Sequence, residues 1–216
     1  MDYVNPQSLV STDWLAEHIN APDVRVVDAS WYMPAENRDP AAEYDAEHIP
    51  GAVRFDIDEI ADTDSDLPHM MPSPEKFSSR MRKAGIGDGN RVVVYDGGMM
   101  LAAARAWWML RTFGHDDVAI LDGGFNKWKA EGRPLEDMPP TPRERHFTAR
   151  LNSTMIRYAD QMLANIDSQK EQVVDARAQA RFDGIAPEPR AGLRGGHIPG
   201  SVCVPFIDVI DDDKTM

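Results

Sequence analysis

Short apolar runs alternate along the chain with longer segments in which apolar residues recur at helical spacing. The run at 91–95 is almost entirely valine, which is typical of strands buried on both faces of a parallel sheet. Strands that alternate with helices predict an α/β fold built on a central parallel sheet. The predicted strands are 24–29, 91–95 and 118–121, and the predicted helices are 7–20, 102–113 and 125–131.

Turn and cap residues mark the boundaries between these segments. Ser73-Pro74 predicts the start of another helix, because serine caps a helix and proline suits its first turn. Pro50-Gly51 predicts a tight turn into a further strand that ends at Phe55. Residues 31–45, with two prolines, and the aspartate-rich stretch 56–66 are expected to be loops.

One pattern occurs twice, which indicates a duplicated unit. Val26-Val27-Asp28-Ala29 is followed by His48-Ile49-Pro50-Gly51, and Val173-Val174-Asp175-Ala176 is followed by His197-Ile198-Pro199-Gly200. Each copy comes after an amphipathic run that opens with serine and threonine, which predicts helix N-caps at Ser11 and Ser153. Both copies should therefore place an aspartate at the end of an equivalent strand.

The second copy is much shorter than the first, since the chain ends sixteen residues after Gly200. We therefore expect a first domain at 1–139, a linker at 140–150 and an incomplete second domain at 151–216, with the rest of that domain beyond Met216. Four prolines between 134 and 142 support the position of the linker.

Composition excludes several classes of protein. The formal net charge of −13 disfavours binding to nucleic acid or to anionic lipid. The sequence has no apolar run of about 18 residues, which predicts no membrane span. The amino-terminal residues do not resemble a signal peptide, and a single cysteine cannot form an intrachain disulfide, so a cytoplasmic protein is expected.

Several ordered motifs resemble the two-domain sulfurtransferases of the rhodanese family. In the first unit they include Glu47-His48-Ile49-Pro50-Gly51-Ala52, Arg105-Ala106-Trp107-Trp108 and Leu121-Asp122-Gly123-Gly124-Phe125. In the second they include Val174-Asp175-Ala176-Arg177, Arg181-Phe182 and Glu188-Pro189-Arg190. The resemblance implies a rhodanese-like three-layer domain followed by an incomplete second copy.

The resemblance also implies an activity. Members of the family move a sulfane sulfur from 3-mercaptopyruvate or thiosulfate to a thiol or to cyanide, through a cysteine persulfide and without a metal or organic cofactor. That cysteine lies in a loop between a strand and a helix, where backbone N–H groups stabilise a thiolate. In the first unit Asp96 stands at the matching position, which implies a silent copy.

Cys203 is the only cysteine of the chain, and it lies in an apolar strand-like run rather than in such a loop. We interpret it as structural, because free cysteine is commonly a small buried hydrophobic residue. The nucleophile is then expected beyond Met216, and the 216-residue chain is expected to be inactive alone.

Four residues are the candidates for site chemistry, all by resemblance to 3-mercaptopyruvate sulfurtransferases. Arg181 and Arg190 would bind the substrate carboxylate with their guanidinium groups, and Arg190 favours 3-mercaptopyruvate over thiosulfate. Asp58 and His69 would form a relay that moves protons near neutral pH. The alternative is that these are solvated arginines and an incidental surface histidine.

Other conspicuous residues are interpreted as structural. His48 and His197 recur in both copies, including the silent one, which favours a role in the turn. Neither has partners at the spacing of a zinc site. Trp31 could line the cleft of the site, but a core position is the expectation.

A second hypothesis is a non-catalytic rhodanese module that binds a protein partner or a small anion, which Asp96 would suit. The expected partners are otherwise a small anionic sulfur donor and a thiol or cyanide acceptor. An incomplete second domain would also leave an apolar sheet face open, so the missing carboxyl-terminal fragment or a second copy is a further possible partner.

Overall fold

The structure is a computed structural model that describes residues 5–190, 192–211 and 215–216. The chain forms two compact units, of which the first runs to Asn152 and the second begins at Ser153. Each unit is described by itself below, as unit 1 and unit 2.

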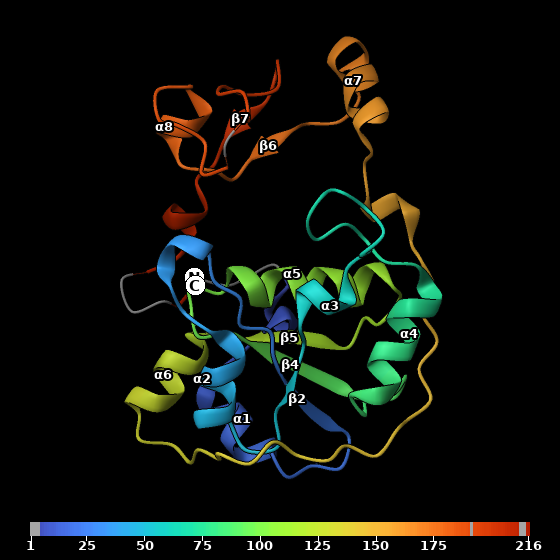
Figure 1. Ribbon diagram of the computed structural model, residues 1–216, viewed down its shortest axis with the longest axis vertical. Helices are drawn as coiled ribbons and strands as arrows, with labels where there is room; N and C mark the ends of the chain where they lie inside the picture. Colours follow the sequence, from blue (N-terminus) through green and yellow to red (C-terminus); the bar gives the residue numbers. More distant parts are fainter. Residues whose placement is uncertain (1–4, 191, 212–214) are drawn as a thin grey trace. The chain divides into compact units, whose positions relative to one another are not determined.

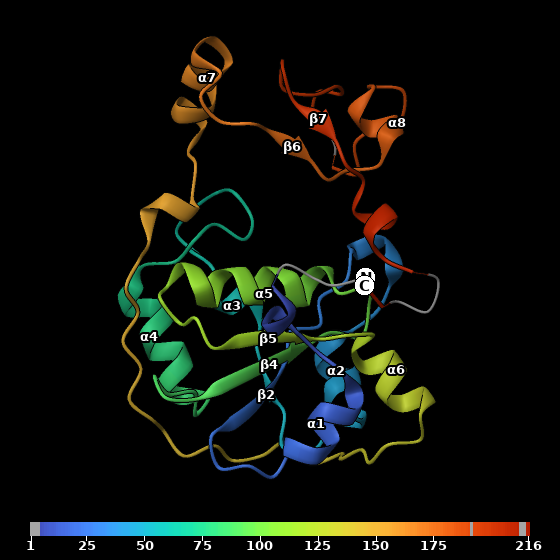
Figure 2. The same cartoon turned by 180° about the vertical axis from the view of Figure 1, so that it is seen from behind.

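Unit 1 is an α/β domain built on a five-stranded parallel sheet with the strand order β1-β5-β4-β2-β3 (Figures 1 and 2). Its elements are η1 (Pro6–Ser8), β1 (Leu9–Val10), α1 (Thr12–His18), β2 (Val24–Asp28), η2 (Pro34–Glu36), α2 (Pro40–Ala46), β3 (Val53–Arg54), α3 (Ile57–Ile60), α4 (Pro74–Lys83), β4 (Arg91–Tyr95), α5 (Leu101–Thr112), β5 (Val118–Leu121) and α6 (Gly124–Ala130).

Both faces of the sheet are covered, so the unit has three layers. Alternate residues of β2 and β4, such as Val26 and Val93, pack in one buried cluster with Leu15 of α1, Tyr44 of α2 and Trp128 of α6. Figure 1 shows α3, α4 and α5 on the opposite side of the sheet. The second core is aromatic on that side, where the ring of Phe77 in α4 packs against those of Phe55, Phe113 and Phe147. The predicted fold class, α/β with a central parallel sheet, is confirmed for unit 1.

The first predicted helix is shorter than expected. It begins at Thr12, where Ser11 caps it by accepting a hydrogen bond from the Trp14 backbone N–H at 3.1 Å. The preceding Leu9–Val10 is instead a strand, because it pairs with β5 at the edge of the sheet. This pairing joins segments about 110 residues apart in sequence, and local periodicity carries no signal for it.

The prediction of a loop over residues 31–45 is wrong, since α2 occupies its second half. Asp39 caps this helix by accepting hydrogen bonds from the N–H groups of Ala41 and Ala42, and Pro40 takes the first helical position. The aspartate-rich stretch likewise begins with α3, capped by Asp56. The predicted cap at Ser73 and first-turn proline Pro74 are both confirmed in α4.

The segment expected to be a linker packs along unit 1. Phe147 is buried, the Phe147 carbonyl accepts a hydrogen bond from Arg82, and the N–H of Ala149 donates to the Ser78 hydroxyl at 2.9 Å. The compact unit therefore extends to Asn152, beyond the boundary at 139 that the prolines indicate. Prolines here produce an extended chain that lies on the domain surface.

Unit 2 has a parallel pair of short strands accompanied by helical segments. Its elements are η3 (Ser153–Met155), α7 (Ala159–Ser168), β6 (Val174–Asp175), α8 (Gln179–Phe182), β7 (Val202–Cys203) and η4 (Phe206–Val209). The predicted cap at Ser153 is wrong, because α7 begins at Ala159 and Gln161 accepts a hydrogen bond from the N–H of Tyr158 before it.

The strand pairs of the two units have the same register. Asp28 lies opposite Arg54 in the β2–β3 pair, and Asp175 lies opposite Cys203 in the β6–β7 pair. Among its described residues unit 2 has none that is buried, and apolar side chains such as Val174 and Val202 are exposed. These observations agree with the expected second copy of a common sheet plan, which stays a prediction.

We predict that Gly85→Ala lowers the free energy of unfolding of unit 1 by about 1–3 kcal/mol. A residue with a side chain is strained at a positive φ, and the added methyl group would crowd Pro142. Gly85 has a φ of +69°, and a Cβ atom would lie 2.9 Å from the Cβ of Pro142. Urea unfolding followed by tryptophan fluorescence measures this change, since all five tryptophans precede residue 152.

The matched control is Gly89→Ala, four residues along the same segment, where a Cβ atom meets nothing within 4 Å. Its free energy of unfolding should stay within about 0.5 kcal/mol of the parent value. Equal effects of the two substitutions would show that residues 140–150 do not pack on unit 1 as described.

Candidate functional site

The carboxyl ends of β2, β3 and β4 meet at one edge of the unit 1 sheet, which is where open α/β sheets bind ligands. The Asp28 carboxylate ends β2 and accepts a hydrogen bond from the N–H of Ser30 at 2.7 Å, which turns the chain towards Trp31. Asp56 follows β3 and caps α3, which sets Asp58 in the first helical turn. The local turns therefore deliver Trp31 and Asp58 to the same edge.

Asp58 and His69 form a hydrogen-bonded pair at this edge. The Asp58 Oδ1 atom lies 2.8 Å from Nε2 of His69, and Oδ2 accepts a hydrogen bond from the Trp31 indole at 3.1 Å. The rings of Trp31 and His69 meet edge to face with centroids 4.9 Å apart. The expectation of a core position for Trp31 is wrong, because this half-buried tryptophan orients both members of the pair.

His69 is held by its backbone as well as by its ring. It has a φ of +57°, which is uncommon for a residue other than glycine. Its carbonyl accepts a hydrogen bond of 2.6 Å from Nη2 of Arg105 in α5. Burial lowers the pKa of Arg105, whose guanidinium also lies over the ring of Trp108. The motif that contains Arg105 does not predict this contact, because its partner is a main-chain carbonyl that side-chain patterns do not show.

A hollow of about 260 Å³ opens beside the pair. Its walls are mostly apolar, and its polar lining residues are Trp31, Glu36, His69 and Arg105. Small-molecule sites typically combine apolar walls with a few placed polar groups. Phe55, Ile57, Leu101 and Ala106 are among its apolar lining residues.

In the loop after β4, the Asp96 carboxylate accepts the hydrogen bonds of the surrounding backbone N–H groups. Asp96 Oδ1 accepts hydrogen bonds from the N–H groups of Gly98 and Met100, at 2.8 and 3.1 Å, and Oδ2 accepts one from Ala103 at 2.8 Å. Burial raises the pKa of Asp96, while these backbone donors act in the opposite direction. The donors that could hold an external anion are thus already occupied.

The neighbouring hollow, of about 290 Å³, has matched charges. Arg38 pairs with Glu43 at 2.6 Å, and Lys129 pairs with Glu47. Each cation is next to a glutamate, which offsets its attraction for an anionic substrate on this side of the Asp96 loop.

In unit 2 the two predicted arginines have different surroundings. Glu188, whose side chain is 5% exposed, accepts hydrogen bonds from Nη2 of Arg181 at 2.5 Å and from Nη1 of Arg177 at 2.8 Å. The bond from Arg181 is the main cause that lowers the pKa of Glu188. Arg190 is exposed and makes no hydrogen bond or ion pair with the residues that the structure describes. Glu188 therefore fixes Arg181, while Arg190 presents a free guanidinium fork.

Cys203 lies on β7, as the sequence predicts, and is half-buried. Its thiol approaches the Arg177 carbonyl at 3.5 Å. Burial raises the pKa of Cys203, and the nearby Asp175 carboxylate raises it further. Reactive cysteines have the opposite environment, in which positive charge or a helix N-terminus lowers the thiol pKa.

His48 and His197 make the same contacts in their respective units. Each ring bonds through Nδ1 to a carbonyl of the preceding helix, His48 to Tyr44 at 2.7 Å and His197 to Phe182 at 2.8 Å. Each also stacks on the aromatic ring of that same residue. These contacts tie the turn to a helix and support the structural interpretation.

The described residues contain no group of three or more His, Cys, Asp or Glu side chains arranged to bind a metal ion. In the same part of the chain, no helix has both the length and the apolar character that crossing a bilayer requires.

The geometry agrees with comparisons to known proteins. Residues 11–131 match the rhodanese-like domain family. The chain is 45% identical to thiosulfate sulfurtransferase of Rattus norvegicus, over 96% of this chain and 72% of that protein. It is 44% identical to 3-mercaptopyruvate sulfurtransferase of Escherichia coli, over 95% of this chain and 73% of that protein.

A plant relative and a solved structure extend the comparison. The mitochondrial thiosulfate/3-mercaptopyruvate sulfurtransferase 1 of Arabidopsis thaliana is 41% identical over 97% of this chain, which spans 61% of the plant protein. The crystal structure of SseA from Escherichia coli has a TM-score of 0.87 and 39% identity, covering 97% of this chain and 79% of that one. This chain therefore belongs to the rhodanese family and is homologous to its 3-mercaptopyruvate and thiosulfate sulfurtransferases.

Proposed function

We propose that this chain takes part in the transfer of sulfur from 3-mercaptopyruvate, or from thiosulfate, to a thiol or cyanide acceptor through a cysteine persulfide. The observation that carries the proposal is the hydrogen-bonded Asp58–His69 pair beside an apolar hollow at the carboxyl edge of the sheet. The names of the homologous sulfurtransferases supply the reaction class.

The pair has a chemical task in such a reaction. When a thiolate takes the sulfur of 3-mercaptopyruvate, the C–S bond breaks and the electron pair remains on carbon as the enolate of pyruvate. That enolate must gain a proton, and a histidine held by a carboxylate can deliver one near neutral pH. Trp31 and Arg105 would keep the ring and backbone of His69 in place for this step.

Arg181 and Arg190 would bind the carboxylate of the donor. A planar guanidinium fork matches a carboxylate, and Glu188 already fixes the orientation of Arg181. A carboxylate-binding pair favours 3-mercaptopyruvate over thiosulfate as the donor, because thiosulfate has no carboxylate.

Cys203 would not carry the persulfide. It lies on a strand, and its carboxylate neighbour disfavours the thiolate form. The nucleophile would then be supplied by protein outside these 216 residues, in a longer chain or in a partner. A cytoplasmic location stays a prediction.

A non-catalytic rhodanese module is the second candidate function. Asp96 favours it, because this carboxylate fills the donors of the loop where unit 1 would otherwise hold a nucleophile or an anion. In this alternative unit 1 binds a protein partner and the Asp58–His69 pair has no chemical role.

The first prediction concerns the nucleophile. We predict that the 216-residue chain and its Cys203→Ser variant release the same, background amount of sulfur from 3-mercaptopyruvate. Protein expressed from the intact gene should be active, and should stay active with Cys203→Ser. The assay follows sulfide release in the presence of a thiol acceptor. Activity of the 216-residue chain that disappears with Cys203→Ser would identify Cys203 as the nucleophile and contradict the proposal.

For the proton relay, we predict that His69→Asn in protein from the intact gene lowers kcat by roughly 100-fold or more, as loss of a general acid typically does. The matched control is His146→Asn, which removes an exposed histidine that also faces a carboxylate, Asp88, at 3.0 Å. Its kcat should stay within about twofold of the parent, since an exposed pair contributes little to stability. Equal kcat values for the two variants would favour the non-catalytic alternative.

For the carboxylate site, we predict that Arg190→Gln raises KM for 3-mercaptopyruvate about 10- to 100-fold, because one charge-assisted interaction is lost. Arg157→Gln is the control, since it removes an exposed arginine of unit 2 that pairs with Glu171. Steady-state kinetics with thiosulfate provide a second comparison, in which the effect of Arg190→Gln should be smaller. Unchanged KM for 3-mercaptopyruvate would remove Arg190 from the site.

A further inference from the structure

Unit 1 has a second hollow, of about 260 Å³, at the opposite edge of its sheet. It lies at the amino ends of the strands, where Val24 begins β2, Gly51 precedes β3 and Gly85 precedes β4. The extended chain from Pro140 to Arg145 forms one of its walls. The Asp58–His69 pair lies at the carboxyl edge, so the two hollows are separate.

Three arginines line this hollow, and no acidic residue does. They are Arg25 of β2 and Arg143 and Arg145 of the covering chain, with apolar, proline and glycine residues making up the remainder. Other hollows of unit 1 combine a cation with an acid, for example Glu43 beside Arg38 and Asp88 near Arg145. Three cations together are unexpected in a chain whose net charge is −13.

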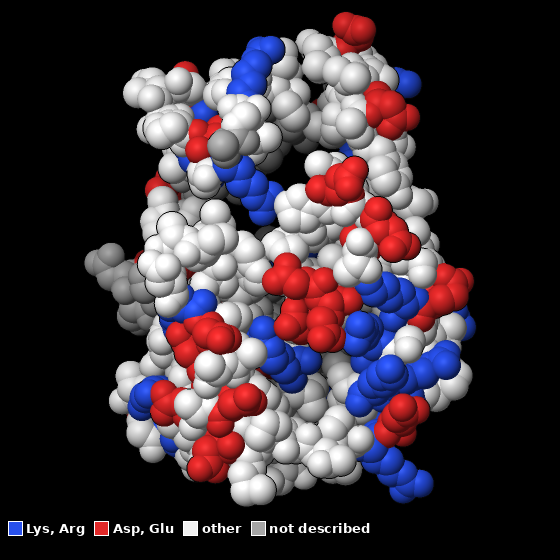
Figure 3. Space-filling view, viewed as in Figure 1, with Lys and Arg blue, Asp and Glu red and all other residues white. Residues whose placement is uncertain are grey.

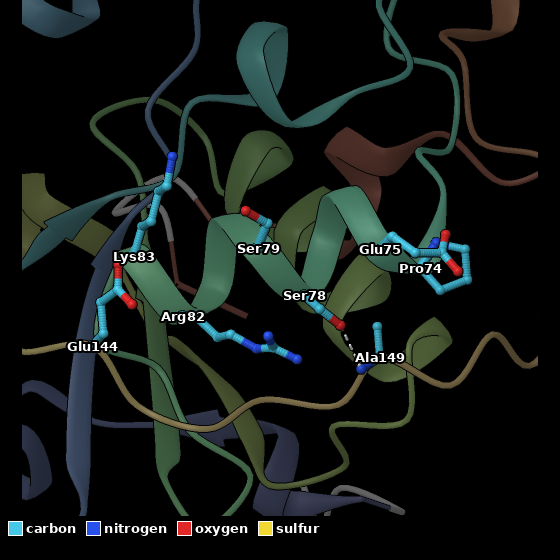
Figure 4. A pocket seen from close by; sticks show the side chains of 8 residues that line it. All are labelled: Pro74, Glu75, Ser78, Ser79, Arg82, Lys83, Glu144 and Ala149. Carbon is cyan, nitrogen blue, oxygen red and sulfur yellow. Dashed lines mark hydrogen bonds between the residues drawn. The ribbon is translucent and has the colours of Figure 1, made fainter.

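The extended covering chain places its charges by alternation. Successive side chains of an extended segment point to opposite sides. Arg143 and Arg145 line the arginine hollow, whereas Glu144 lines a different groove on the side of α4, where Figure 4 draws it with Lys83 and Arg82. Figure 3 shows Lys and Arg side chains gathered over the region of α4, with some Asp and Glu side chains among them.

Close backbone approach holds the covering chain in place. A Cβ atom on Gly85 would meet Pro142, and one on Gly87 would lie 3.1 Å from the Cβ of Arg145. The N–H of Asp88 donates to the His146 carbonyl at 3.0 Å. Arg143 and Arg145 therefore approach Arg25 on a backbone that is fixed at both ends of the contact.

The three guanidinium groups lack acidic partners. Arg25 donates only to neutral carbonyls, to Gly85 from Nε at 3.3 Å and to Val24 from Nη1 at 2.5 Å. None of the three forms an ion pair with a residue that the structure describes. Acids in the neighbourhood are Asp23, which acts on Arg25 electrostatically, and Asp88, which lines an adjacent hollow together with Arg145. Glu136 is also close, since its Oε2 accepts a hydrogen bond from the N–H of Gly51.

The charge of Arg145 acts on Arg25. Burial lowers the pKa of Arg25, the charge of Arg145 lowers it further, and Asp23 opposes both. Like charges that share a hollow repel one another, and a bound anion would offset that repulsion. Guanidinium forks match the paired oxygens of a phosphate-like group better than a single point charge does.

We propose that Arg25, Arg143 and Arg145 form a binding site for a small dianionic oxyanion of the phosphate type, separate from the sulfur-transfer site. The volume of the hollow suits an inorganic oxyanion or a small phosphate monoester better than a nucleotide, since sites for larger ligands are typically about 300–1,000 Å³. The proposal is independent of the sulfur-transfer function, because it rests on residues with no part in that site.

The test is an NMR titration of the 216-residue chain, labelled with nitrogen-15, with inorganic phosphate at constant ionic strength. We expect saturable shifts in the amides of Gly85, Gly87 and Arg145, with a dissociation constant of about 1 mM or lower. Glycerol phosphate in a parallel titration distinguishes an ester-binding site from one for the free ion. Acetate, a monovalent carboxylate, should bind at least tenfold more weakly than phosphate.

Substitutions assign the site. Arg143→Gln and Arg145→Gln replace exposed side chains, so folding should be retained, and each should weaken phosphate binding at least tenfold. Arg80→Gln is the matched control, because it removes the same charge from a partly exposed arginine that is paired with Glu59 at 2.9 Å. Its dissociation constant should stay within twofold of the parent.

Three results would overturn the proposal. The first is a titration that does not saturate up to about 50 mM phosphate. The second is an equal weakening of phosphate binding by Arg80→Gln and Arg145→Gln. The third is saturable shifts confined to residues of unit 2 around Arg181. Acetate binding as tight as phosphate would also overturn the assignment to a dianion.

Discussion

The parallel register of β2 with its two neighbours is the constraint on which the candidate site depends. Asp28, the last residue of β2, lies opposite Arg54 of β3 and Tyr95 of β4. The chain segments that leave these strands consequently start at the same edge of the sheet. Trp31, Asp58 and Asp96 come from three such segments, and a slip of one residue in either pairing would send their side chains in new directions.

At this edge of the sheet, the chemistry of unit 1 depends on which charged side chains already have a partner of opposite charge or hydrogen-bond donors. The Asp96 carboxylate occupies the N–H groups of its own loop, and Arg38 and Lys129 are paired with glutamates. What is left at this edge is a histidine held by a carboxylate, a tryptophan and an apolar hollow. That combination can move a proton but supplies no sulfur nucleophile. On β7 of unit 2, burial and the Asp175 carboxylate raise the pKa of Cys203, which disfavours its thiolate form.

Sequence reasoning predicted the parts of the fold that depend on local patterns. The valine-rich β4 and the Ser73-Pro74 helix start follow from residue type and order. The pairing of Asp58 with His69 was implied only by the family resemblance, and the two side chains are hydrogen-bonded in the structure. It failed where distant contacts decide. Leu9–Val10 is a strand only because β5 lies beside it, and the proline-rich segment at 140–150 packs because Phe147 enters the aromatic core.

Two further failures have different causes. The helix α2 is not predicted although Asp39-Pro40 is a recognisable helix start, because Pro34 and Pro40 are also typical of a loop. Trp31 was assigned to the core, since a sequence does not show that its indole N–H has a carboxylate partner twenty-seven residues away. The arginine hollow could not be predicted at all, because Arg25 is far from Arg143 and Arg145 in the chain and only the packed covering segment unites them.

The most direct test of the central claim is to locate the sulfur after reaction with the donor. Protein from the intact gene and the 216-residue chain would each be exposed to 3-mercaptopyruvate, alkylated and mapped by peptide mass spectrometry. The account predicts no persulfide on Cys203 in either sample, and a persulfide on a different cysteine in the protein from the intact gene. A persulfide on Cys203 in both samples would contradict it.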